Sequence, residues 1–219
     1  MKYAKLLQAG DTIGVCAPSS GVKESLLPRL DKAFSSVREL GYETIETASV
    51  RRRAKCVSAD AETRWKSLDG KSNHILEGRM IGGCLDVLCK LLGTRFAPVP
   101  AFLERYKSDG FIWTLESCEM SAADIYRSLW QMCECGWFQY CVGVLFGRPD
   151  GYSDTYGFTL TDALESGLGG LGVPVIYDVD IGHVPPQIQI INGAYGKIDY
   201  NDGSATIWQE MKVWSDSKQ

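Results

Sequence analysis

Apolar residues follow two patterns in the first part of the chain, a short run and then a helical repeat. Residues 11–18 form an apolar run that a proline and two serines close, which predicts a buried strand. Residues 25–40 carry apolar side chains at helical spacing and end at Gly41, which predicts a helix. A second strand is expected at 42–47. Strand, helix and strand of this length predict a parallel β-α-β unit, whose active edge would be the loop Ala17-Pro18-Ser19-Ser20.

The pattern dissolves into charged and small residues between Ala48 and Asn73, and this is the best candidate for a domain boundary. Beyond it, apolar runs and helical repeats alternate. They predict strands at 75–81, 111–115, 142–146 and 173–177, and helices at 85–92, 122–135 and 159–168. Three last stretches, joined by Asn-Gly and Asp-Gly turns, predict antiparallel strands at 187–191, 194–200 and 205–209.

These elements indicate the α/β class. We expect a truncated Rossmann-like parallel β-α-β unit in residues 1–64, and a mixed α/β C-terminal domain with antiparallel strands in residues 65–219.

Composition narrows the function classes. The 219 residues are 45% apolar and 23% charged, which is typical of a folded domain. No apolar run reaches the roughly 18 residues that span a membrane, and residues 1–10 lack the features of a signal peptide. The net charge of −4 disfavours a nucleic-acid partner, and the basic cluster at Arg51–Lys55 is interpreted as a solvated loop.

The cysteines and histidines restrict metal chemistry. None of the eight cysteines forms a C-x-x-C pair, and Cys16, Cys84, Cys89 and Cys141 lie in apolar segments. We therefore expect a reducing, cytoplasmic compartment with no metal and no cofactor. With only two histidines in the chain, histidine-dependent catalysis must use one of them.

His183 is the stronger of the two histidines as a candidate base. It lies in D-V-D-I-G-H-V-P-P, where a glycine and two prolines fix the loop, and a rigid loop suits a general base. The alternative is a loop histidine bonded to a backbone carbonyl. His74 lies in a polar stretch without flanking rigidity.

Glu116 ends the apolar strand F-I-W-T-L-E, so its carboxylate is expected at the rim of the sheet. There it could orient a histidine by accepting a ring N–H. Alternatively, it could cap the following helix together with Ser117 and Glu119.

Two further motifs contain glycine. Gly82 and Gly83 precede a predicted helix and could bring backbone N–H groups close to a substrate carboxylate, or could simply form a tight turn. Ser153, in G-Y-S-D, resembles a nucleophile turn, but no apolar helix directly follows it.

Five phrases, taken in order, resemble the LD-carboxypeptidase family and its microcin-immunity branch. They are K-L-L-Q-A-G-D-T-I-G-V-C-A-P-S-S near the start, E-G-R-M-I-G-G-C-L-D-V-L from Glu77, F-I-W-T-L-E-S-C-E from Phe111, V-G-V-L-F-G-R-P from Val142 and D-I-G-H-V-P-P from Asp180. The resemblance covers residues 6–63 and 65–213.

The resemblance implies a cytoplasmic serine peptidase with a Ser, Glu, His triad in that order. Such enzymes cleave the amide between an L- and a D-residue of muropeptides, or a peptidyl- or aminoacyl-nucleotide antibiotic. Glu116 would orient the base, His183 would be the base, and Gly82 and Gly83 would shape the cleft. Relatives commonly form homodimers, a state that the sequence leaves open.

The nucleophile of that family has no counterpart here. The family's serine follows a third parallel strand, in a G-x-S-D turn before the acid, whereas this chain passes from C-V-S-A-D-A-E-T-R directly into W-K-S-L-D-G. The missing stretch would hold on the order of 90 residues, or three β-α units. Ser153 follows Glu116 and is not assigned the role.

Three hypotheses follow. The first is an LD-carboxypeptidase homologue with impaired activity, or an incomplete gene model that lacks a segment near Arg64. The second is a non-catalytic protein that binds a peptide or an aminoacyl-nucleotide. The third is a hydrolase that uses Ser153.

Overall fold

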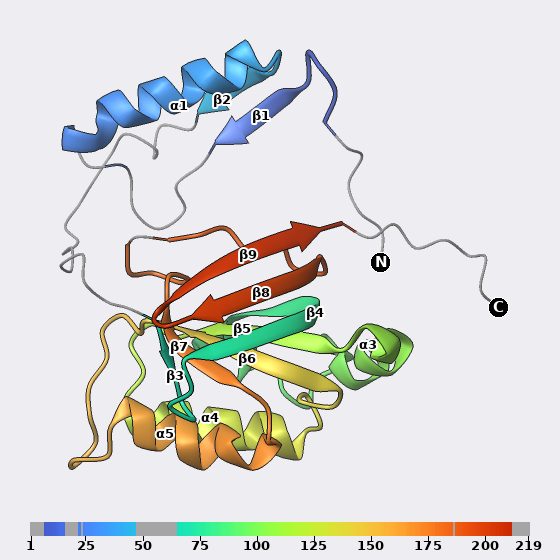
Figure 1. Ribbon diagram of the computed structural model, residues 1–219, viewed down its shortest axis with the longest axis vertical. Helices are drawn as coiled ribbons and strands as arrows, with labels where there is room; N and C mark the ends of the chain where they lie inside the picture. Colours follow the sequence, from blue (N-terminus) through green and yellow to red (C-terminus); the bar gives the residue numbers. More distant parts are fainter. Residues whose placement is uncertain (1–6, 16–21, 23, 47–64, 186, 212–219) are drawn as a thin grey trace. The chain divides into compact units, whose positions relative to one another are not determined.

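The computed structural model describes residues 7–15, 22, 24–46, 65–185 and 187–211 (Figure 1). The described residues fall into two compact units, one within residues 2–58 and the other within residues 59–219. The loop at 17–20, Cys16, the basic cluster at Arg51–Lys55 and the junction near Arg64 lie outside the described residues.

The smaller unit contains the expected β-α-β arrangement. Strand β1 (Thr12–Val15) pairs in parallel with β2 (Glu43–Glu46), and helix α1 (Leu27–Glu39) connects them after the short 3-10 helix η1 (Glu24–Leu26). A proline in the first turn suits the start of α1, because its fixed φ is helical and its missing N–H is not needed there. The parallel unit predicted from the sequence is confirmed.

The larger unit is built on a seven-stranded mixed sheet, ordered β3-β7-β6-β5-β4-β8-β9. Strands β4 to β7 are parallel neighbours, and the remaining pairings are antiparallel. The mixed α/β class is therefore confirmed. The strands are β3 (Lys66–Ser67), β4 (Asn73–Cys84), β5 (Phe111–Glu116), β6 (Cys141–Gly147), β7 (Val175–Val179), β8 (Tyr195–Asn201) and β9 (Ser204–Glu210).

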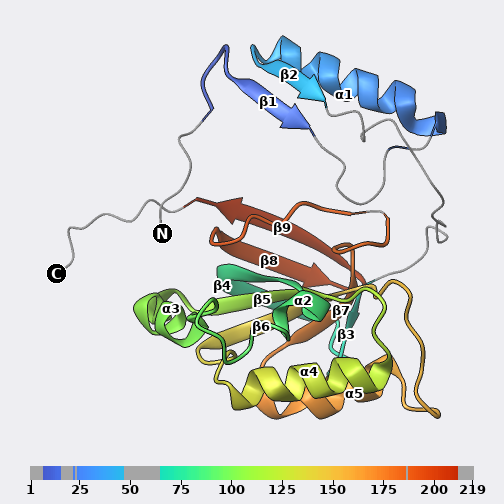
Figure 2. The same ribbon diagram turned by 180° about the vertical axis from the view of Figure 1, so that it is seen from behind.

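Helices α4 (Ala122–Glu134) and α5 (Leu160–Leu168) lie side by side on one face of this sheet (Figures 1 and 2). The shorter helices α2 (Leu85–Leu88) and α3 (Val99–Arg105) lie in the connection between β4 and β5. Single 3-10 turns, η2 (Lys107–Asp109) and η3 (Gly169–Leu171), follow α3 and α5.

Strand β5 separates two apolar cores. Phe111, Trp113 and Leu115 pack into the core under the helices, whereas Ile112 packs into the core on the opposite face. All six residues of β5 are buried. A central parallel strand covered on both faces has an uninterrupted apolar run, which is why this strand was predicted so closely.

The structure corrects two predicted elements. The helix expected at 85–92 is α-helical only as far as Leu88, because the next turns use N–H to C=O bonds three residues apart. Residues 187–191 do not form a strand. The backbone N–H of Ile188 donates to the Asp180 carbonyl, and that of Ile191 donates to the Gln209 side chain, so these groups are not available for a sheet ladder.

One strand, β3, and one α-helix, α3, were not predicted. Among the described residues, the helices are too short or too polar for any of them to cross a bilayer.

Candidate active site

The carboxyl ends of the parallel strands meet at one edge of the sheet. Glu116 is the last residue of β5 and pairs in register with Cys84 at the end of β4. Gly147 ends β6, and a β-carbon placed there would lie 2.9 Å from the Glu116 β-carbon. The loop that carries His183 follows β7. Functional groups of parallel sheets gather at this edge, so the sequence correctly placed Glu116 at the rim.

Glu116 and His183, 67 residues apart in the sequence, meet at this edge. His183 Nδ1 lies 2.9 Å from Glu116 Oε2. A carboxylate can only accept a hydrogen bond when it is ionised, so this contact would use Nδ1–H as the donor and leave the ring lone pair on Nε2. The His183 side chain is 35% exposed and that of Glu116 is 10% exposed. The Glu116 carboxylate is thus nearly buried, and the ring that it contacts is partly exposed.

The loop approaches Glu116 so closely that residue 182 has to be glycine. Gly182 has φ +96°, a conformation that residues with a side chain rarely adopt. A β-carbon there would lie 2.8 Å from Glu116 Cβ, Cγ and Oε2. Because Gly182 precedes His183, this contact brings the imidazole to the carboxylate.

Helix α4 does not use Glu116 as its cap. Its N-cap is Ser121, whose hydroxyl accepts a hydrogen bond from the backbone N–H of Asp124. The alternative in which Glu116, Ser117 and Glu119 cap the next helix is therefore wrong.

The two candidate cleft glycines have different surroundings. A β-carbon on Gly82 would overlap the Thr114 carbonyl on the neighbouring strand, so this glycine allows close approach of β4 and β5. Its own carbonyl accepts a hydrogen bond from Asn192 Nδ2 at 3.3 Å. Around Gly83 only a Leu88 methyl comes within 4.0 Å. Gly83 therefore leaves open space at the end of β4.

Three side chains are compared as nucleophiles: Ser153 for its motif, Ser117 because it follows Glu116 in the sequence, and Cys84 because it pairs with Glu116 across the sheet. Ser153 is exposed and its backbone carbonyl accepts from Ala122 N–H, but its hydroxyl has no hydrogen bond with Glu116 or His183. Ser117 is completely buried. Burial, together with the nearby Glu116 carboxylate, raises the pKa of the Cys84 thiol to about 12, so it stays protonated at neutral pH. None of the three is activated for attack.

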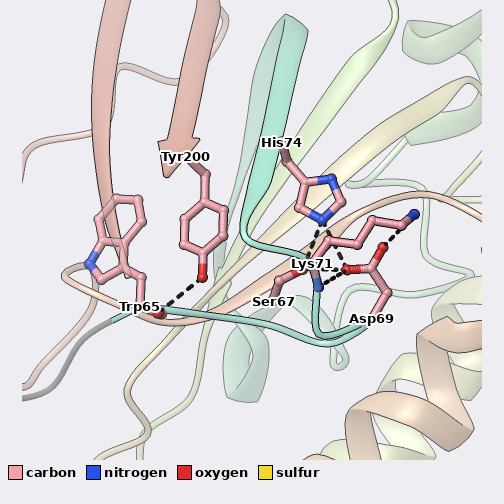
Figure 3. Close-up of polar contacts among 6 residues, drawn as sticks. All are labelled: Trp65, Ser67, Asp69, Lys71, His74 and Tyr200. Atoms are coloured by element: carbon pink, nitrogen blue, oxygen red, sulfur yellow. Dashed lines mark hydrogen bonds and ion pairs between the residues drawn. The ribbon is translucent and has the colours of Figure 1, made fainter. Parts of the chain in front are cut away.

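His74 belongs to a separate polar turn, shown in Figure 3. Its Nε2 lies 2.9 Å from both Ser67 Oγ and Asp69 Oδ1, and Ser67 Oγ donates to the same Asp69 oxygen. A catalytic base would need the serine and the carboxylate on different ring nitrogens. Burial opposes ionisation of Asp69, but hydrogen bonds from Ser67, His74 and Lys71 outweigh it and hold its pKa below the ordinary value. These contacts brace the turn before β4.

The described residues contain no cluster of three or more His, Cys, Asp or Glu side chains that could hold a metal ion. We call the Glu116–His183 pair at this edge the dyad.

A family model matches the part of the chain that contains this pair. Residues 77–198 match the LD-carboxypeptidase C-terminal domain, and this segment is more than half of the chain and contains both dyad residues. The chain belongs to the LD-carboxypeptidase family. This confirms the resemblance found in the sequence.

Two curated relatives, both provisionally named carboxypeptidases, extend the match. The one from Streptomyces coelicolor is 32% identical over 133 residues, which are 59% of this chain and 39% of that protein. The one from Vibrio cholerae is 26% identical over 126 residues, which are 57% of this chain and 36% of that protein. The chain thus spans less than half of the length of these relatives.

Solved structures share the fold. Muramoyltetrapeptide carboxypeptidase from Oxalobacter formigenes aligns with a TM-score of 0.58 at 14% identity, over 93% of this chain and 100% of that one. The microcin C7 self-immunity protein MccF aligns with TM-scores of 0.54 in complex with adenosine monophosphate and 0.51 in complex with glutamyl sulfamoyl guanosine. These alignments have 20% and 18% identity, and cover 77% and 85% of this chain and 47% and 57% of those chains.

Proposed function

We propose that this chain carries the acid–base half of an LD-carboxypeptidase site, with His183 as the general base and Glu116 as the residue that orients it. The observation that carries the proposal is the 2.9 Å contact between His183 Nδ1 and Glu116 Oε2 at the carboxyl edge of the parallel strands. Gly83, and with it Gly82, would shape the cleft beside the dyad.

The proposed proton transfer depends on which ring nitrogen of His183 is bound to Glu116. With Nδ1–H bound to Glu116, Nε2 can take the proton of a hydroxyl as that oxygen attacks the substrate carbonyl. The same proton then passes to the amine that leaves when the amide bond breaks. Glu116, as the acceptor of Nδ1–H, would stabilise the imidazolium that forms between the two steps.

The proposed substrates are an amide between an L- and a D-residue of a muropeptide, or the amide of a peptidyl- or aminoacyl-nucleotide. Family membership supports a peptidase of this kind. The muramoyltetrapeptide carboxypeptidase and the nucleotide-bound forms of MccF share the fold, which supports the two substrate classes as the ones to test.

Activity of the chain alone is proposed to be impaired. The described residues contain no hydroxyl activated by His183, and the sequence lacks the G-x-S-D turn of the family before Glu116. Without an attacking hydroxyl the acyl-enzyme route is closed, although the dyad remains.

This impairment predicts that a fluorophosphonate probe will not label the protein, because the probe reports an activated serine. Mass spectrometry of the intact protein measures the labelling, and Ser153→Ala is the matched variant. Release of the terminal D-residue from a muramoyl tetrapeptide, followed in parallel, should stay at the rate without protein. If the unmodified protein is labelled and Ser153→Ala is not, the proposal is wrong and the protein is a hydrolase that uses Ser153. Labelling that Ser153→Ala leaves intact would place the nucleophile elsewhere.

A non-catalytic binding protein is the second candidate, and one observation favours it. A pocket of about 400 Å³ borders Gly82 and is lined almost entirely by apolar side chains, among them Trp113 and Trp137. Calorimetry with adenosine monophosphate and with a muramoyl tetrapeptide tests this candidate. Binding without release of the D-residue supports it, and the absence of binding to either ligand removes it.

A further inference from the structure

The segment that carries His183 is held by a buried arginine. Arg148 follows the end of β6 and is only 7% exposed. Its NH2 group donates to Asp180 Oδ1 at 2.7 Å and to the Val184 carbonyl at 3.1 Å, and its NH1 group donates to the Pro185 carbonyl at 3.3 Å. These contacts lie on both sides of His183 in the sequence.

Asp180, the carboxylate at the start of this segment, is itself held in place. Its second oxygen, Oδ2, accepts a hydrogen bond from the indole N–H of Trp65 at 2.9 Å, and its backbone carbonyl accepts from Ile188 N–H at 2.7 Å. Trp65 is in turn fixed by its backbone, since its N–H donates to the Gly203 carbonyl and its own carbonyl accepts from Tyr200 OH. Figure 3 shows the hydrogen bond from Tyr200 OH to the Trp65 carbonyl. The carboxylate thus has a defined orientation before Arg148 binds it.

A buried ion pair is a weak means of stabilising a fold, because removing two charges from water offsets most of their attraction. A planar guanidinium, however, fixes several acceptors in one geometry. Here the acceptors are Asp180, Val184 and Pro185, which surround a histidine whose ring has to meet a carboxylate on another strand.

We propose that Arg148 and Asp180 are positioning residues, whose ion pair fixes residues 180–185 so that His183 Nδ1 reaches Glu116. The inference rests on the proposed role of His183 as the base. Arg148 contacts the Asp180 carboxylate and the backbone carbonyls of Val184 and Pro185, so the pair would act through the backbone of the segment. They would set which nitrogen of His183 faces the cleft.

The test measures which nitrogen of His183 carries the proton. The ¹⁵N spectrum of histidine-labelled protein reports this directly, at about two pH units above the ordinary imidazole pKa. Only His74 and His183 contribute signals, and a His74→Gln variant assigns them. The variants are Arg148→Met, Arg148→Lys and Asp180→Asn.

Arg79→Met is the matched control. Arg79 is 4% exposed, is ion-paired with Asp109 and donates to the Gly193 carbonyl, so it is a buried arginine of the same sheet with a comparable setting. Its hydrogen bonds to Asp109 and to the Gly193 carbonyl hold segments other than residues 180–185. Thermal unfolding of every variant shows whether it is folded at the temperature of the measurement.

In Arg148→Met, the ratio of Nδ1–H to Nε2–H tautomers of His183 should fall about tenfold, which corresponds to 1.4 kcal/mol. Asp180→Asn should lower it in the same direction, Arg148→Lys should lower it less, and Arg79→Met should leave it within twofold. If Arg148→Met is unfolded, the tautomer ratios of Arg148→Lys and Asp180→Asn test the positioning role instead. Ratios unchanged in the folded variants would overturn the positioning role.

The variant Glu116→Gln separates this outcome from a failure of the proposed function. If Glu116→Gln changes the ratio and the Arg148 and Asp180 variants do not, only the positioning role fails. If Glu116→Gln also leaves the ratio unchanged, the dyad itself is absent in solution, and the proposed function fails with it.

Discussion

Replacing Gly182 by alanine should separate His183 from Glu116 and lower the free energy of unfolding by about 2–4 kcal/mol. The methyl group would enter space that Glu116 Cβ and Cγ occupy, at 2.8 Å, and the backbone there has φ +96°. Since neither atom of Glu116 lies at a free end of the side chain, the loop has to move. Denaturant unfolding measures the loss of stability, and the ¹⁵N signal of His183 reports the loss of the Nδ1 contact.

Gly172→Ala is the control for this substitution. Gly172 also has positive φ, +66°, but nothing lies within 4 Å of a β-carbon placed there. Its replacement should cost about 1 kcal/mol, from backbone strain alone, and should leave the His183 signal unchanged. A Gly182→Ala protein that unfolds like Gly172→Ala and keeps the His183 contact would show that the close approach does not position the base.

Replacing Asp109 by alanine should destabilise the larger unit by about 3 kcal/mol, near the lower end of the range for broken buried pairs. Arg79 Nε donates to Asp109 Oδ2 at 2.9 Å, and the Arg79 guanidinium also lies 4.6 Å from the centre of the Tyr106 ring. The Asp109 side chain is 22% exposed, so water partly compensates the remaining charge. Urea unfolding with an unchanged m-value is the measurement.

The double variant Arg79→Met with Asp109→Leu is the control for that result. Removing both charges leaves no uncompensated ion, so the double variant should recover most of the stability that Asp109→Ala loses. A loss below about 1 kcal/mol in Asp109→Ala would mean that solvent reaches Arg79 and that its burial has little energetic consequence.

The sequence predicted the parallel core because its pattern depends on local burial. Strand β5 is buried on both faces, so its apolar run is continuous, and α4 ends within one residue of the predicted boundary. The pattern failed where tertiary contacts decide. Residues 187–191 have strand-like alternation, but their N–H groups bond to the Asp180 carbonyl and the Gln209 side chain instead.

In the candidate site, too, local sequence predicted some features, and tertiary contacts decided the others. Glu116 and His183 each had an ordinary alternative from local sequence, and only the family resemblance linked them before the structure showed their contact. Arg148 lies in V-G-V-L-F-G-R-P and Asp180 in D-I-G-H-V-P-P, but nothing in the sequence pairs them. An arginine is normally expected on the surface, and its burial between β6 and the His183 segment depends on contacts more than 30 residues away in the sequence.

The most direct measurement of the central claim is the tautomer of His183 in the unmodified protein and in Glu116→Gln. We expect the unmodified protein to hold the ring proton on Nδ1, and Glu116→Gln to shift it toward Nε2, because an amide is a weaker acceptor than a carboxylate. A ring proton that resides on Nε2 in the unmodified protein, or a tautomer that Glu116→Gln leaves unchanged, would contradict the assignment of Glu116 and His183 as an acid–base dyad.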